Sequence, residues 1–326
     1  FSDTNEIDKN LQELKKAELD PLLYRLTCLD IGARETACID QKISQRMALR
    51  LIGSQLLPFS SVLFGIGLVL RQVWRFFRKV NTPWPQVPLI PLSLIDMVLL
   101  IAGGFVLLGE VGSPLFSLPF IGALTSDLSL PLRESLKIFM GYVGMTIPPL
   151  LIFRRQVQSI QNQSPPLGGW LQWRFSPINK AFADACQGWL IVTPFVLLIS
   201  LIMNYFFSDP GGSNPLLEMV LMSRNFGALA IIFITTAVLA PLFEEFLFRG
   251  VLLPVLVGKQ GKDFGVLLSA LIFALAHLSV GELPPLFILG VGLALLRLSS
   301  GRLFPCVIMH ALWNGITFAN LLLLSA

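Results

Sequence analysis

The sequence has little charge, since only 13% of its 326 residues are Asp, Glu, Lys or Arg while 54% are hydrophobic. Soluble globular domains carry about 25% charged residues, so this chain lacks the polar shell that a soluble fold needs. Several apolar runs approach the roughly 20 residues with which a helix crosses a bilayer. We therefore expect an all-α, polytopic membrane protein that is multi-pass and integral to the plasma membrane or an internal membrane.

Other absences exclude further classes. The four cysteines include no CxxC pair, which gives no support to a zinc ribbon or a thioredoxin-like site. Cys28 and Cys38 could pair in an oxidising compartment, but free, partly buried thiols are the expectation. No basic–aromatic stripe suggests nucleic acid as a partner, and no signal peptide is recognisable. The sequence begins with Phe1, which is consistent with a fragment or a processed form.

The apolar runs predict about eight transmembrane helices behind a different N-terminal segment. Residues 1–46 are rich in charge and amphipathic, which predicts short helices outside the membrane or at its interface. Residues 47–155 hold the N-terminal membrane helices, 156–186 form a cytoplasmic linker, and 187–326 form a C-terminal core. The predicted spans are 47–70, 89–108, 136–153, 187–207, 227–257, 264–279, 283–298 and 303–325.

The connections between these spans alternate in charge. The segments around 71–88, 154–185, 258–263 and 297–302 together contain twelve Lys and Arg residues, whereas 109–135 and 208–226 contain one each. Because cytoplasmic loops favour Lys and Arg, the basic connections are expected on the cytoplasmic side. In the last of them, Arg297 and Arg302 supply the charge. Eight spans then put both termini outside.

Histidine is scarce, and its positions are informative. His277 and His310 are the only two, and both follow the pair Glu244–Glu245 within apolar runs. Ionisable groups inside a membrane cost about 2.5–3.5 kcal/mol or more each, so they usually line a functional cavity. Glu244 precedes the centre of the GKQGK turn by 16 residues and His277 follows it by 17, which predicts equal depth in a helical hairpin. His310 lies beyond the basic turn on the same side, so the three could share one pocket that opens toward the cytoplasmic side.

Spacing within two helices separates supporting from reactive groups. Glu245 and Arg249 are four residues apart in the order that favours an ion pair, and this pair can be structural. Glu244 points about 100° away and is left as an unpaired carboxylate suited to general acid–base work. His310 and Asn314 are also four apart, and both can donate to a developing oxyanion. The simpler interpretations are a packing role for each histidine and an interhelical hydrogen bond for Asn314.

These residue types predict hydrolysis of an amide bond by activated water. Glu244 and His277 would deprotonate the water, and His310 with Asn314 would stabilise the oxyanion. Alternatively, Glu244, His277 and His310 could bind a zinc ion that acts as the Lewis acid. The HExxH motif of zincins is absent, so we predict no cofactor firmly, and zinc stays an alternative.

Three segments carry a family resemblance. EEFLFRG (244–250), FALAH (273–277) and HALWN (310–314) resemble the EExxxR, FxxxH and HxxxN signatures of the CPBP family. This family, also called the Abi family, contains the CAAX proteases and bacteriocin-processing proteins. The resemblance covers about residues 225–322 and implies an intramembrane protease related to type II CAAX prenyl endopeptidases. It implies that Glu244 and His277 activate water, that His310 and Asn314 hold the intermediate, and that Glu245 and Arg249 support the site.

The sequence thus predicts an endopeptidase, of glutamate or metallo type, with a membrane protein or peptide as substrate and the bilayer as surroundings. Prenylated CAAX-type proteins are one candidate substrate class, and the oligomeric state is not predicted. One alternative is a non-catalytic scaffold or regulator of membrane-protein assembly that keeps the protease fold. A transporter is the other, since intramembrane Glu, His and Arg also build proton relays, but the polar groups gather in one half of the chain only.

Overall fold

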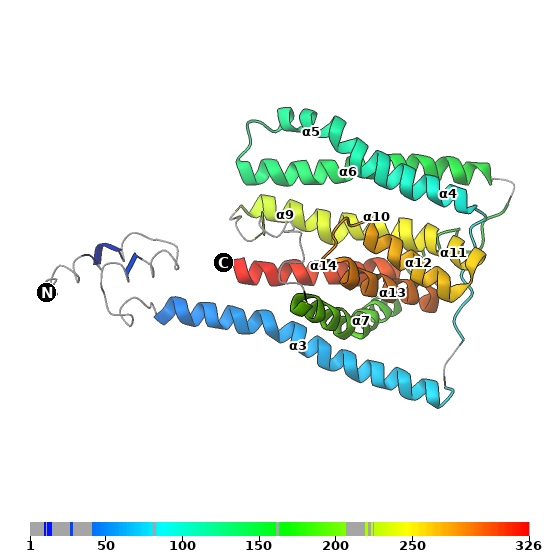
Figure 1. Cartoon of the computed structure of the whole chain (residues 1–326), viewed down its shortest axis with the longest axis horizontal. Helices are drawn as coiled ribbons and strands as arrows, with labels where there is room; N and C mark the ends of the chain where they lie inside the picture. Colours follow the sequence, from blue (N-terminus) through cyan, green and yellow to red (C-terminus); the bar gives the residue numbers. More distant parts are fainter. Residues whose placement is uncertain are drawn as a thin grey trace. The chain divides into compact units, whose positions relative to one another are not determined.

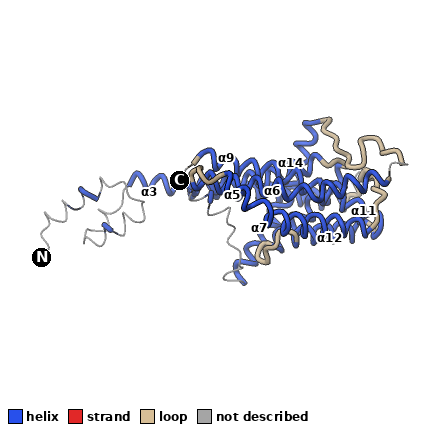
Figure 2. Tube along the Cα trace, turned by 90° about the horizontal axis from the view of Figure 1, so that it is seen from above, coloured by secondary structure: helices blue, strands red, loops and turns tan. Residues whose placement is uncertain are grey.

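The computed structural model describes residues 10, 12–14, 27–28, 41–80, 83–160, 163–206, 219–220, 223 and 225–325. The chain divides into two compact units, residues 1–57 and 58–326, and each is described by itself. The described residues form helices and no strand, so the predicted all-α class is confirmed. In the larger unit the helices run along a common direction, with most loops at their ends (Figures 1 and 2).

The helices follow one another with short connections. Several runs are continuous helices interrupted by π-helical segments, labelled η. The elements are α3 (Gln41–Phe77), α4 (Leu94–Val98), η2 (Leu99–Gly112), α5 (Ser113–Leu124), α6 (Leu130–Ser159), α7 (Ile178–Phe206), α9 (Phe226–Ile234), η3 (Thr235–Leu239), α10 (Ala240–Glu245), η4 (Phe246–Leu252), α11 (Leu253–Gln260), α12 (Lys262–Leu275), α13 (Leu283–Ser300) and α14 (Phe304–Ser325).

Seven helices of the described part, rather than the predicted eight, are long and apolar enough to cross a membrane. The difference is the predicted span 264–279, which is the 14-residue helix α12. At 1.5 Å per residue this helix is about 21 Å long, less than the roughly 30 Å of a hydrocarbon core. After α12 the chain passes through the turn that contains His277 and continues as α13.

Most other helices are longer than the apolar runs that predicted them. The predicted span 89–108 began five residues too early, since the helix runs from Leu94 to Leu124, and 136–153 lies in Leu130–Ser159. The helices also extend into the expected 156–186 linker, since α6 ends at Ser159 and α7 begins at Ile178. Polar residues at helix ends, such as Arg154 and Arg155, continue the helix beyond its apolar part, which hydropathy alone does not detect.

The N-terminal prediction falls largely outside the described residues. In the small unit, Cys28 is disulfide-bonded and fully buried, so the expectation of a free thiol there was wrong. Cys186 and Cys306 are free. Sequence spacing could not decide between the two states of Cys28 because pairing depends on tertiary proximity.

The long helix Phe226–Gln260 positions the site. Its central α10 segment lies between the π-helical segments η3 and η4. Such π-segments often occur at functional sites, and they change which side chains face the interior. Phe243, Leu247 and Phe248 anchor this stretch in the largest apolar core, against residues of η2 and α12. The two glutamates therefore lie on a helix whose rotation is fixed by packing on both sides of them.

Candidate active site

Glu245 is the centre of a fully buried ionic network. Its Oε1 lies 2.9 Å from Nη1 of Arg249 and 2.9 Å from Nδ1 of His310. The Glu245 and Arg249 side chains have no exposed area, and His310 is 3% exposed. Arg249 also donates to the carbonyl of Gly290 on α13 and lies 4.2 Å over the Phe273 ring. The i, i+4 ion pair expected from the sequence thus joins four helices at one point.

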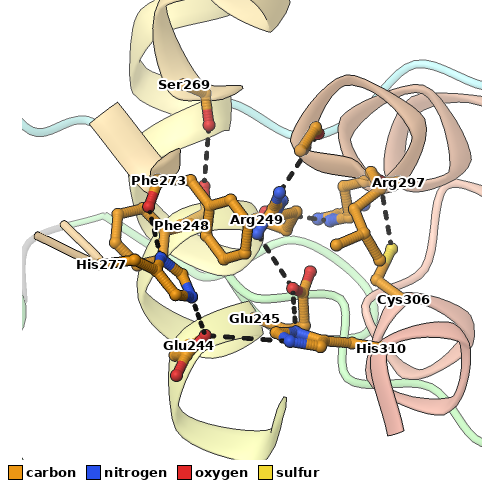
Figure 3. A network of polar contacts seen from close by, with 12 residues as sticks. Glu244, Glu245, Phe248, Arg249, Ser269, Phe273, His277, Arg297, Cys306 and His310 are labelled. Carbon is orange, nitrogen blue, oxygen red and sulfur yellow. Dashed lines mark hydrogen bonds and ion pairs between the residues drawn. The ribbon is translucent and has the colours of Figure 1, made fainter. Parts of the chain in front are cut away.

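Glu244 points to a different cluster, as the 100° offset predicts. Its Oε1 accepts a hydrogen bond of 3.1 Å from the Tyr142 hydroxyl of α6. Its Oε2 lies 3.8 Å from Nε2 of His277 and 3.8 Å from Nε2 of His310. Figure 3 shows both imidazoles directed at this carboxylate. Oε2 is buried and has no hydrogen-bond partner among the described residues.

His277 lies in the turn just after α12 and is oriented by its own helix. Its Nδ1 is 2.8 Å from the carbonyl oxygen of Phe273, and a carbonyl only accepts, so Nδ1 carries the proton. The neutral ring then has its lone pair on Nε2, facing Glu244. His277 is 27% exposed and Glu244 13%, so the reactive side of the cluster is reachable while the Glu245 side is sealed.

Phe273 is the packing centre of the two histidines. Its ring meets His277 edge-on with centroids 4.7 Å apart, and His310 edge-on at 5.8 Å. Aromatic pairs favour such geometry because the positive ring edge meets the negative face. Phe273 has no exposed area, so its ring is held in place between the two imidazoles, which reach Glu244 from different elements.

Arg297 is part of this buried core. The prediction that it supplies charge to the 297–302 connection was therefore wrong. Its side chain is fully buried in α13. Nε donates to the carbonyl of Arg249 at 3.2 Å, and Nη2 to the carbonyl of Leu171 at 3.3 Å. The Arg302 side chain is 7% exposed and pairs with Asp184 at 3.1 Å. Both arginines therefore hold helices and the 163–177 connection together. Because they are buried in these contacts, they say little about which side of the membrane the 297–302 connection faces.

Asn314 forms an interhelical hydrogen bond. This was the simpler interpretation of Asn314, beside a role as donor to an oxyanion. Its Nδ2 donates to the carbonyl of Thr236 in η3 at 2.8 Å. A π-helical segment shifts its backbone register and can leave carbonyls for such bonds. The structure thus brings Glu244, His277 and His310 around one carboxylate oxygen, and it ties Asn314 to the neighbouring helix.

Tyr142 is a site residue that the sequence motifs do not include. It comes from α6, and its hydroxyl is the direct partner of Glu244. The sequence could have indicated Tyr142, because a tyrosine in the middle of an apolar helix usually needs a hydrogen-bond partner for its O–H. The chain has three tyrosines, and Tyr142 is the one within the predicted span 136–153.

A metal ion was the alternative for Glu244, His277 and His310. Zinc holds its nitrogen and oxygen ligands at about 2.0–2.2 Å, nearly always tetrahedrally in structural sites. Within the described ranges, no group of three His, Cys, Asp or Glu side chains is arranged to hold a metal ion. The arrangement of the described residues therefore gives the zinc alternative no support.

Comparisons with known proteins match the same region. A family model described as type II CAAX prenyl endopeptidase Rce1-like matches residues 226–316, and one described only as a domain of unknown function matches 2–49. The membrane-embedded CAAX protease MroQ of Staphylococcus aureus (strain USA300) is 27% identical over 137 residues, which is 40% of this chain and 54% of MroQ. The chain thus covers about half of that relative, and no solved structure matches.

The segment that matches the protease family model contains all three motifs. It holds both glutamates, both histidines and Arg249, whereas Tyr142 lies outside it. The resemblance seen in the sequence is thereby confirmed. Residues 226–316 are thus similar to the CPBP family of CAAX proteases, a family of membrane proteases.

Proposed function

We propose that this protein is an intramembrane endopeptidase that cleaves membrane-associated proteins or peptides with water activated by Glu244 and His277. The observation that carries the proposal is the position of Glu244 Oε2, which is buried, has no hydrogen-bond partner among the described residues and lies 3.8 Å from two imidazole nitrogens. Because the matching family model and MroQ are described as CAAX proteases, prenylated CAAX-type proteins are the first substrate class to test.

The three atoms are not hydrogen-bonded directly to one another. A distance of 3.8 Å is too long for a direct hydrogen bond. Neutral His277 offers a lone pair on Nε2, and Glu244 offers only acceptors. Two acceptors facing each other need a donor between them. A water molecule that donates one hydrogen to each would fill this need, and its oxygen would become nucleophilic.

The reaction then needs no covalent intermediate. Glu244 takes a proton from the water, whose oxygen attacks the carbonyl carbon of the scissile amide. His310 in its doubly protonated form donates from Nε2 to the oxyanion, while its Nδ1 faces the Glu245 carboxylate at 2.9 Å. When the C–N bond breaks, the proton on Glu244 passes to the leaving amine. Asn314 assists as a second donor if its amide turns from Thr236 toward the substrate.

Glu245 and Arg249 hold His310 in position. Their ion pair fixes His310 through Nδ1, so the imidazole presents Nε2 to the reacting centre. The connections after α3, α6 and α11 lie at one end of the bundle (Figure 1). These are the basic connections, so we place that end, and access of substrate to Glu244, on the cytoplasmic side.

The test is a comparison of membrane proteomes from cells that carry the wild-type chain or Glu244→Gln. The substitution keeps the shape of the side chain and removes its basicity. We expect uncut termini of specific membrane proteins to accumulate in the variant, with Asp263→Asn as a control on an exposed carboxylate. Identical termini in Glu244→Gln and wild type, with both proteins present at equal level, would argue for a scaffold in place of a protease.

A further inference from the structure

A pocket adjoins the catalytic glutamate from the side of the N-terminal helices. It has a volume of about 530 Å³ and lies between the helix formed by η2 and α5 and the facing helix α6. This volume is within the usual range for ligand pockets. Its walls are mostly apolar, and its polar groups are few: Glu110, Glu134, Lys137 and Tyr142. Residues 94–159 lie outside the segment matched by the protease family model.

The two carboxylates of this pocket differ in their partners. Glu134 is neutralised by Lys137 at 2.8 Å and Arg133 at 3.3 Å. Glu110 has no ion pair among the described residues, and its Oε2 is buried without a hydrogen-bond partner there. An unpaired carboxylate in apolar surroundings is costly, so Glu110 gains by binding a positively charged group. The pocket therefore favours a cationic ligand over a neutral or anionic one.

Tyr142 forms part of the wall between the pocket and Glu244 and contacts both. This side chain lines the pocket, and its hydroxyl donates to Glu244. A substrate side chain that enters the pocket would thus lie one tyrosine away from the carboxylate that activates water, which suits a substrate residue beside the scissile bond.

We propose that this pocket is the subsite for a Lys or Arg side chain of the substrate, next to the scissile bond, with Glu110 as the residue that selects it. The inference rests on the proposed protease function for its biological meaning. Its physical content, binding of a basic side chain at Glu110, can be measured without cleavage.

The experiment uses the full chain in lipid vesicles and a positional library of membrane-tethered peptides. Binding is measured by photo-crosslinking in a Glu244→Gln background, and cleavage is measured with Glu244 present. We expect Lys and Arg to be enriched at one position, and Glu110→Gln to reduce that enrichment about tenfold. Glu110→Lys should shift the preference to Asp and Glu. Asp127→Asn, an exposed carboxylate in the turn after α5, is the matched control and should change nothing.

A second variant fills the pocket without altering its charge. Gly141 lines the pocket, and a Cβ added there meets no atom within 4 Å, so Gly141→Leu should fold and block the basic side chain. Gly67→Leu, at another glycine with open space, is its control. Equal enrichment in wild type and Glu110→Gln at every position would overturn the subsite. Basic peptides that bind through Glu110 but are never cut would uphold the subsite and refute the protease.

Discussion

The buried ionic network around Glu245 predicts how much free energy of unfolding is lost when this carboxylate is removed. Glu245→Ala removes the carboxylate that contacts both Arg249 and His310 at 2.9 Å. Arg249 has no exposed area, so its charge cannot turn to water, and only the Gly290 carbonyl and nearby aromatic rings such as Phe273 remain as partners. Removing one partner of a buried ion pair costs about 3–5 kcal/mol.

The assay is thermal unfolding of the purified protein in detergent micelles. One kcal/mol corresponds to about 2–4 °C in proteins of about 150–250 residues, so we expect Tm to fall by about 6 °C or more. Glu134→Ala is the control, because Glu134 belongs to an ion pair with 38% exposure and exposed pairs contribute about 0–1 kcal/mol.

A double variant separates the ion pair from simple loss of packing. Glu245→Leu combined with Arg249→Met replaces both charges by apolar groups, which restores a balanced interior. The combined loss of stability should be clearly smaller than the sum of the two single losses. Additive losses, or a Glu245→Ala variant as stable as wild type, would show that the pair does not hold these helices together.

Further predictions concern residues around the same centre. Tyr142→Phe deletes the donor to Glu244 Oε1 and should lower kcat about tenfold with KM unchanged, measured on a cleaved membrane-tethered peptide; a changed KM with normal kcat would contradict positioning. Arg297→Met leaves the carbonyls of Arg249 and Leu171 without their donor and should cost about 1–3 kcal/mol in the same unfolding assay, whereas an unchanged Tm would show that these bonds do not stabilise the fold. Dialysis against a chelator should leave cleavage intact, and stoichiometric zinc by elemental analysis with loss of activity on its removal would instead favour the metal alternative.

The sequence predicted the all-α membrane fold because its apolar runs match the length that a helix needs to cross a bilayer. It predicted the facing directions of Glu244 and Glu245 because helical geometry fixes side chains one and four residues apart. The sequence also predicted that Glu244 and His277 lie close together, because they are nearly equally far along the chain from the GKQGK turn. In these cases the geometry of single helices and of one helical hairpin agrees with the tertiary packing. Such local geometry was therefore enough to predict these features.

Other features depended on contacts between distant segments. The span 264–279 was counted as a transmembrane helix, but α12 stops at Leu275 and the chain turns at His277. Arg297 was assigned to the basic connection 297–302 between two apolar runs, whereas packed elements enclose it. Tyr142 and Glu110 entered no motif, since their importance arises only from the placement of α6 and η2 beside the long helix. Composition cannot report such placement.

The most direct test of the central claim is cleavage in a purified system. The full chain and its Glu244→Gln variant would be reconstituted in lipid vesicles with a library of membrane-tethered peptides, and products would be identified by mass spectrometry. We predict that the wild-type chain produces defined cuts, that Glu244→Gln produces none, and that both have the same Tm. Equal cleavage by the two proteins would contradict the catalytic role of Glu244.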